Sequence, residues 1–113
     1  MHEMSIAEGV IQLLEEQAQA QHFSRVKTLW LEVGPLASVD VQALSFCFEA
    51  VSRHTLAEAA TLNIIEVPGL AWCLGCEGQV PIRQRFDACP DCGSYQLQVI
   101  QGDELRVKEL EVD

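Results

Sequence analysis

Basic residues are scarce in this chain of 113 residues, which holds 7 Lys and Arg against 17 Asp and Glu for a net charge of −10. Proteins that bind nucleic acid need clustered Lys and Arg to displace the counterions of the phosphate backbone. Arg83 and Arg85 are the only basic residues between the two cysteine pairs described below. Because an acidic surface repels phosphates, the chain is predicted not to bind nucleic acid.

Long apolar runs are also missing. The opening Met-His-Glu-Met lacks the basic region of a secretion signal, and no run of the ~20 apolar residues that span a bilayer follows it. We therefore expect no membrane insertion and a cytoplasmic location. The five cysteines agree with this expectation, because an odd number with four in metal-ligand spacing suits a reducing compartment better than a disulfide framework does.

The residue sets of common catalytic centres are absent as well. The sequence contains no recognisable Ser-His-Asp set, no paired-carboxylate cleft and no glycine-rich phosphate loop. A length of 113 residues also leaves little room for a large enclosed active site. We therefore predict that the protein is not an enzyme.

Four of the five cysteines form two C-x-x-C pairs, Cys73 with Cys76 and Cys89 with Cys92, and twelve residues separate the pairs. Zinc binds four sulfur ligands tetrahedrally, so two short loops that each offer two sulfurs form a closed structural site. Two disulfides, a dithiol redox centre and a rubredoxin-like iron site are the alternatives, but two pairs at ribbon spacing favour zinc. Cys47, the fifth cysteine, lies on the apolar stripe of a predicted helix and is expected to be a core residue.

Periodicity predicts an α+β fold. Ser5 and Glu8 match a capping box, which predicts a helix from Ser5 to about Gln21. A second helix follows Ser38 or Asp40 as its cap and ends near Arg53. Two apolar stretches with β-branched residues predict strands over residues 25–33 and 62–67. Partial alternation with charged exposed positions predicts a final strand over residues 104–112.

These elements predict a small mixed sheet of about three strands with two helices, plus an inserted zinc-ribbon module with two C-x-x-C knuckles. The last strand is expected to rejoin the first sheet. The predicted domains are an α/β domain of residues 1–68 and 102–113, and a ribbon module of residues 69–101 whose small core depends on its metal. Pro68-Gly69 and Gly102 mark the predicted boundaries.

The first residues form a second candidate metal site. If the helix begins at Ser5, the Met1 amine, the amide of residue 2 and the His2 imidazole are exposed and can chelate an ion that accepts planar nitrogen ligands, such as nickel or copper. The amide or carboxylate of Glu3 can add a further ligand. A histidine at position 2 can equally be an ordinary exposed polar residue.

Several segments together resemble the HypA/HybF family of hydrogenase maturation nickel chaperones over the whole chain. They are the opening Met-His-Glu-Met-Ser, Leu-Glu-Val-Gly at residues 31–34, Phe48-Glu49, the cysteine pairs and the closing Gly-Asp-Glu-Leu-Arg-Val-Lys-Glu-Leu-Glu-Val. The resemblance implies a labile Ni(II) site at Met1, His2 and Glu3, and a structural Zn(II) at the cysteines. It also implies transfer of nickel to the large-subunit precursor of a [NiFe]-hydrogenase with the GTPase HypB.

Two questions stay open at this point. A zinc-ribbon adaptor that only recognises a protein partner is the alternative function, and a homodimer is not excluded. One departure from the family is clear, because some members carry a histidine directly after a C-x-x-C pair, where this chain has Glu77 and Gly93. We therefore predict four sulfur ligands at zinc and no exchange of histidine for cysteine.

Overall fold

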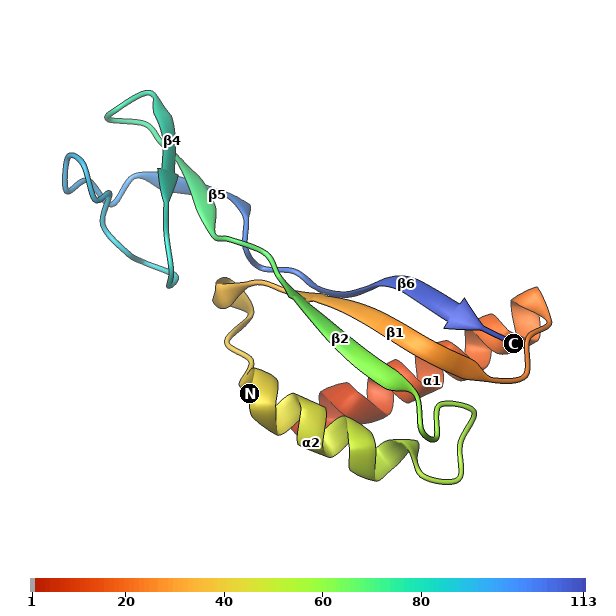
Figure 1. Ribbon diagram of the computed structural model, residues 1–113. Helices are drawn as coiled ribbons and strands as arrows, with labels where there is room; N and C mark the ends of the chain where they lie inside the picture. Colours follow the sequence, from red (N-terminus) through yellow and green to blue (C-terminus); the bar gives the residue numbers. More distant parts are fainter. Residues whose placement is uncertain (1) are drawn as a thin grey trace. The chain divides into compact units, whose positions relative to one another are not determined.

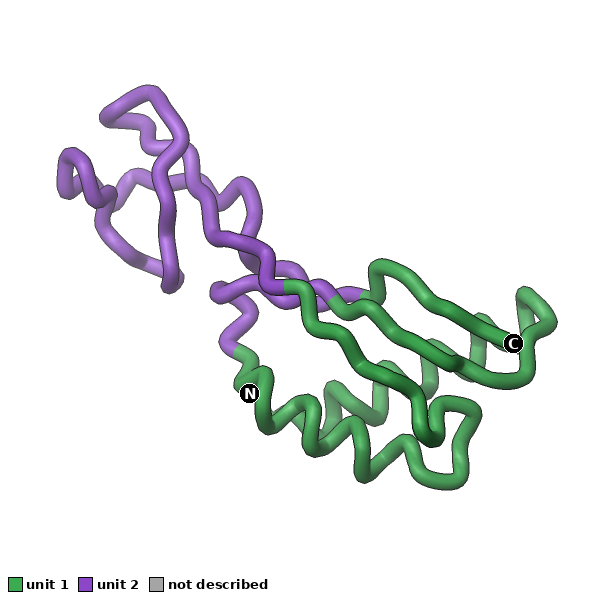
Figure 2. Tube along the Cα trace, viewed as in Figure 1, with its two compact units in different colours: residues 1–31, 39–65, 107–113 green, residues 32–38, 66–106 purple. Residues whose placement is uncertain are grey.

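The computed structural model describes residues 2–113, and the chain divides into two compact units (Figure 2). Unit 1 comprises Met1–Leu31, Val39–Ile65 and Val107–Asp113, and unit 2 comprises Glu32–Ser38 and Glu66–Arg106. The domain boundaries expected from the sequence, with residues 69–101 as the ribbon module, remain a prediction. Within residues 2–113, neither helix combines the length and the apolar character needed to cross a bilayer.

A mixed three-stranded sheet and two helices form the first part of the fold (Figure 1). The elements in chain order are α1 (Glu3–Gln21), β1 (Val26–Val33), the 3₁₀ turn η1 (Pro35–Ala37), α2 (Val41–Ser52), β2 (Thr61–Glu66) and, at the end of the chain, β6 (Leu105–Val112). The strand order is β2-β1-β6, and both helices lie on the same face of the sheet. This confirms the two predicted helices, the three predicted strands and the return of the last strand to the first sheet.

Backbone hydrogen bonds show in which direction each strand of this sheet runs. β2 runs parallel to β1, as the βαβ connection through α2 requires, and β6 runs antiparallel to β1 (Figure 1). On the β2 side, Val26 N donates to Leu56 O (2.9 Å) at the start of β1, and Val67 N donates to Val33 O (3.0 Å) at its end, so both strands run in the same direction. On the β6 side, Asp113 N donates to Arg25 O and Gly34 N donates to Glu104 O (both 2.9 Å), so the end of β6 lies beside the start of β1.

The core of unit 1 follows from two periodicities. Leu29 and Leu31 alternate along β1 and are buried, while Ala7, Ile11 and Leu14 place one buried stripe along α1. Leu44 and Phe48 form the equivalent stripe on α2. Burying each large apolar side chain stabilises the fold by about 1.5–3 kcal/mol.

The helix starts agree only partly with the sequence prediction. Asp40 caps α2 as expected, because its side chain accepts a hydrogen bond from the Ala43 amide at 3.1 Å. The prediction that α1 starts at a Ser5 capping box is wrong, because α1 begins at Glu3 and its N-cap, His2, makes no side-chain capping bond. The His2 carbonyl already accepts from the Ile6 amide at 3.1 Å, and a first-turn carboxylate suits the positive end of the helix dipole.

Unit 2 contains the second sheet, which is antiparallel and has the strand order β4-β3-β5. Its strands are β3 (Leu70–Cys73), β4 (Gly78–Pro81) and β5 (Leu97–Gln101). One face packs a small core of Leu36, Ala71, Cys73, Val80, Ile82 and Cys89, with Leu97 against it. Two of these core residues are cysteines of the C-x-x-C pairs, so this core and the candidate metal site share side chains.

Three glycines allow three backbone segments of unit 2 to meet closely. A Cβ atom on Gly34 would lie 2.0 Å from the Gly102 carbonyl oxygen, and one on Gly69 would lie 2.2 Å from the Ile82 carbonyl oxygen. Gly102 has φ 116°, a backbone conformation that strongly favours glycine. The Leu36 amide donates to the Gly102 carbonyl at 2.8 Å, so the close approach forms a regular hydrogen bond.

We predict that Gly34→Ala destabilises the protein by about 3 kcal/mol or more, because its methyl group collides with backbone that cannot rotate away. Gly9→Ala is the matched control, since nothing lies within 4 Å of a Cβ at that position of α1. Better helix propensity should stabilise this control by up to about 1 kcal/mol. Urea unfolding of both variants measures the difference, and equal stabilities would contradict the close approach.

Candidate metal centre

Two turns of the same design hold the four cysteines. Cys73 ends β3, and its carbonyl accepts from the Glu77 amide at 2.8 Å. In the second turn the Cys89 carbonyl accepts from the Gly93 amide at 2.9 Å. Glu77 and Gly93 occupy matching positions and both adopt positive φ, 55° and 77°. Each turn therefore closes on its own backbone and brings its two sulfurs to one side.

The four sulfur atoms lie within 4.8 Å of one another. Cys73 Sγ is 3.6 Å from Cys92 Sγ, and Cys76 Sγ is 3.8 Å from Cys89 Sγ. A tetrahedral ion with metal–sulfur bonds of about 2.3 Å separates its sulfurs by about 3.8 Å. All four cysteines are free thiols, so the spacing matches metal ligands rather than disulfides.

Backbone amides around the sulfurs stabilise negative charge. The Cys76 amide donates to Cys73 Sγ at 3.3 Å, and the Asp91 amide donates to Cys89 Sγ at 3.4 Å. Amides of Cys92 and Asp91 lower the pKa of the Cys89 thiol to about 7. These bonds orient the sulfurs and favour the thiolate form that binds metals.

Neighbouring sulfurs also make one thiol harder to ionise. The Cys76 thiol hydrogen-bonds to the sulfurs of Cys92 and Cys89, and these contacts raise its pKa above the ordinary value. Four thiolates at this separation repel strongly unless a cation lies among them. The donor set is soft and closed, which suits zinc, or iron in a rubredoxin-like cage.

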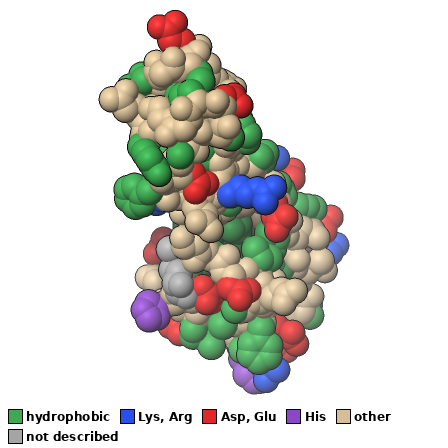
Figure 3. Space-filling view, turned by 90° about the vertical axis from the view of Figure 1, so that its left-hand side faces the viewer, with side chains coloured by type: hydrophobic (Ala, Val, Ile, Leu, Met, Phe, Trp, Pro, Cys, Tyr) green, Lys and Arg blue, Asp and Glu red, His purple; other side chains and the backbone are tan. Residues whose placement is uncertain are grey.

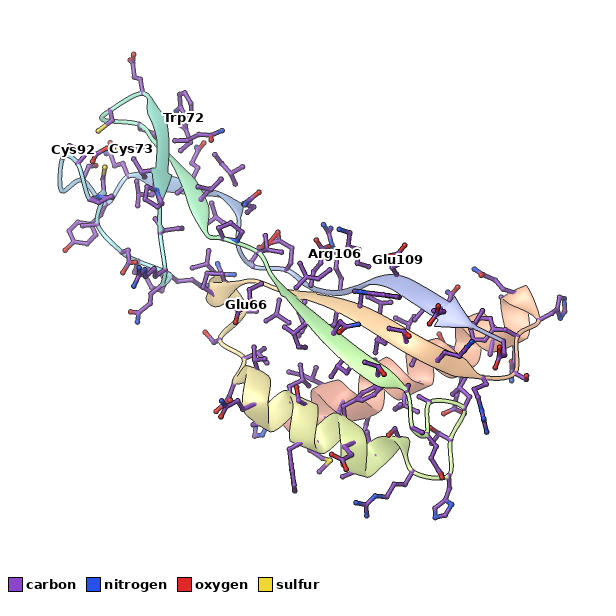
Figure 4. All side chains as sticks on the ribbon, viewed as in Figure 1. Glu66, Trp72, Cys73, Cys92, Arg106 and Glu109 are labelled. Atoms are coloured by element: carbon purple, nitrogen blue, oxygen red, sulfur yellow. The ribbon has the colours of Figure 1, made fainter. Side chains whose placement is uncertain are left out.

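Burial divides the four ligands into two kinds. Cys73 and Cys89 are buried in the core of unit 2, whereas Cys76 and Cys92 are exposed. Cys73 and Cys92 lie together at one side of the sheet, and Trp72 points to the other side of β3 (Figure 4). Cys47 lies half-buried on α2 and is not part of the group.

The residues predicted to bind nickel lie at the start of α1. His2 is exposed and precedes the helix, while Glu3 is the first helical residue and is half-buried. Met1 lies outside the described residues. The predicted arm of four residues is therefore shorter than expected, because Glu3 and Met4 are helical. The His2 amide still precedes the helix, where amides have no acceptor within the helix.

In the part of the chain that the structure describes, the four cysteines are the one group of three or more His, Cys, Asp or Glu side chains placed to share an ion. A site at His2 and Glu3 must therefore draw on main-chain nitrogens as well as side chains. Acidic side chains are scattered over the face drawn in Figure 3, where Lys and Arg are fewer. The net charge of −10 favours the approach of cations.

Fold and site together define a class of small metal-binding protein, in which a mixed α/β unit is joined to a three-stranded module with a closed four-cysteine site. Residues 1–112 match the family model described as "HypA: Hydrogenase/urease nickel incorporation, metallochaperone, hypA". The chain belongs to the HypA family, as the sequence resemblance implied.

Relatives and solved structures agree with this assignment. The chain is 73% identical to the hydrogenase maturation factor HypA of Azotobacter chroococcum mcd 1 and 70% identical to that of Azotobacter vinelandii. Both matches cover 100% of each chain. The solution structure of the Ni metallochaperone HypA from Helicobacter pylori matches with a TM-score of 0.72 at 24% identity, over 99% of this chain and 97% of that one, which supports the fold.

Removing one sulfur should unfold the module locally. We expect Cys73→Ser to lose the tightly bound metal and the hydrogen-exchange protection of β3, β4 and β5, because the small core of unit 2 contains this ligand. Amides of α1 should stay protected. Cys47→Ser is the control and should keep one metal ion per chain, since Cys47 lies outside the group. Unchanged protection of β3 in Cys73→Ser would refute the dependence on metal.

Proposed function

We propose that this chain is a nickel metallochaperone that binds Ni(II) at its amino terminus and delivers it to the large-subunit precursor of a [NiFe]-hydrogenase. The proposed nickel ligands are the His2 imidazole, the main-chain nitrogens beside it, Glu3 and the Met1 amine. The observation that carries the proposal is the family match over residues 1–112, because it includes the amino terminus and both cysteine pairs. The names of the relatives point to hydrogenase rather than urease.

Cys73, Cys76, Cys89 and Cys92 hold a structural Zn(II) in this proposal. The sulfur spacing and the closed donor set support zinc, which keeps four ligands and offers no vacant position for water. The positions after the pairs, Glu77 and Gly93, offer no imidazole. The proposed zinc shell therefore contains sulfur only, and the protein acts as a carrier rather than as an enzyme.

In this proposal the two sites exchange their ions at different rates. An ion among four sulfurs, two of them buried, leaves only when the module opens. An ion at exposed His2 meets solvent and incoming ligands directly. The GTPase HypB is the proposed partner in loading or transfer, and the cytoplasm is the proposed location. A homodimer stays compatible with this scheme.

We predict that His2→Ala weakens nickel binding by more than about 100-fold, because even the loss of a group that only supports a metal ligand costs about 10- to 100-fold. His22→Ala and His54→Ala are matched controls, since both histidines are exposed and lie outside the proposed site. Calorimetric titration of untagged protein, with metal analysis, measures both ions.

The same variants separate the two candidate functions. A zinc-ribbon adaptor without nickel transfer requires that His2→Ala leaves nickel stoichiometry and hydrogenase maturation unchanged. Loss of nickel binding in His22→Ala or His54→Ala, with binding retained in His2→Ala, would also contradict the proposed site. Zinc content should stay at one ion per chain in all three variants, because none of them touches the cysteines.

Acidification should release nickel before zinc. Protons compete directly with nickel for the imidazole and for a main-chain nitrogen, which binds only after it loses its proton. The cysteine sulfurs are held in a closed shell with backbone donors that favour thiolate. Stepwise dialysis to lower pH with metal analysis of the retained protein tests the order, and zinc loss at or above the pH of nickel loss would contradict it.

A further inference from the structure

Residues 83–87 of unit 2 form a turn that presents a basic and aromatic tip. The Asp87 carboxylate accepts hydrogen bonds from the amides of Arg83 at 3.2 Å and Gln84 at 3.0 Å. The Asp87 amide returns to the Gln84 carbonyl at 3.3 Å. These bonds hold the backbone of the turn and leave the side chains of residues 83–86 exposed.

Phe86 is the most exposed large apolar side chain among the described residues, with 93% of its surface accessible. Its φ of 68° lies in the left-handed region, which is unusual for a bulky side chain. Because the ring is almost fully exposed and the backbone conformation is strained, Phe86 adds almost no burial free energy to the fold. The free energy of burying its ring becomes available only when another molecule covers it.

Arg83 and Arg85 place positive charge in the same turn as Phe86. They are the only basic residues between Gly69 and Asp103 in the sequence of a protein whose net charge is −10. The Arg85 guanidinium lies 3.9 Å from the Asp103 carboxylate, and both side chains are about half exposed. An exposed pair at this distance is weak, so the guanidinium can exchange its partner for another carboxylate.

We infer that the 83–87 turn is a docking site for a carboxylate-bearing, apolar segment of a partner protein. The partner inserts acidic side chains between Arg83 and Arg85 and covers Phe86 with an apolar side chain. Aromatic and Arg residues with this exposure are the usual anchors of protein interfaces. Arg83 and Arg85 attract the few carboxylates of such a segment. The acidic remainder of the chain repels it less than it repels nucleic acid, which carries one charge per phosphate, or a second copy that carries −10.

The docking site lies apart from the proposed nickel ligands in sequence and shares no residue with them. Its failure and the failure of the nickel site can therefore be told apart. Each variant below receives a nickel titration beside the docking assay. Unchanged nickel binding shows that a loss of docking is confined to the turn.

The test titrates the zinc-loaded full chain with a short synthetic peptide in which glutamates flank a central Leu-Phe pair, and follows backbone amide resonances by NMR. We expect shifts at residues 83–87. Phe86→Gly should weaken peptide binding by about tenfold or more while leaving the melting temperature unchanged or raised, because glycine tolerates positive φ. Arg83→Gln with Arg85→Gln should weaken it similarly.

The matched control is Phe46→Ala on α2, where 72% of the Phe46 surface is exposed, and its peptide affinity should equal that of the unaltered chain. A peptide with glutamines in place of the glutamates should bind about tenfold more weakly or worse. Absence of peptide binding, equal binding by Phe86→Gly, tighter binding of single-stranded oligouridine or a Phe86-dependent dimer in sedimentation would each overturn the inference.

Discussion

Mutual repulsion of four cysteine sulfurs is the constraint on which the metal module depends. The sulfurs lie within 4.8 Å of one another, and thiolates at that distance are stable together only around a cation. Cys73 and Cys89 also belong to the small apolar core under the β4-β3-β5 sheet. A core of this size cannot stabilise three short strands alone. A metal ion bound by these sulfurs would therefore be part of the fold of unit 2 and poorly suited to transfer to another protein.

The amino terminus has the opposite properties. His2 is exposed and is the N-cap of α1, and its side chain makes no capping bond, so neither its imidazole nor its amide is held by the hydrogen bonds of the helix. An ion held there can leave without unfolding any element, which is the property that a metal carrier requires. The start of α1 at Glu3 fixes the position of these atoms, because the Ile6 amide binds the His2 carbonyl. The family match and this contrast between the two sites support the same function.

Much of the architecture could be predicted from local patterns. The alternation of Leu29 and Leu31 and the spacing of Ala7, Ile11 and Leu14 lead directly to β1 and α1, because burial of one face imposes each period. The spacing of the cysteines led to the four-sulfur group for a similar reason, since two short turns present their sulfurs in only a few ways.

Other features depend on contacts that no local pattern contains. A capping box at Ser5 fits the sequence, yet the helix starts earlier because the His2 carbonyl accepts a hydrogen bond from the Ile6 amide. The close approach of Gly34 to Gly102 joins segments far apart in the chain. Phe86 is exposed because it lies in the turn that Asp87 closes. The sequence shows only an apolar residue in a polar stretch, which does not reveal whether its side chain is buried or exposed.

Isotope exchange followed by native mass spectrometry tests the central contrast most directly. Untagged protein loaded with zinc and nickel of one isotopic composition is mixed with an excess of both metals in another, and the mass of the intact complex is followed with time. Nickel should exchange while the original zinc stays bound. Exchange of zinc as fast as nickel, or zinc exchange without nickel exchange, would contradict it.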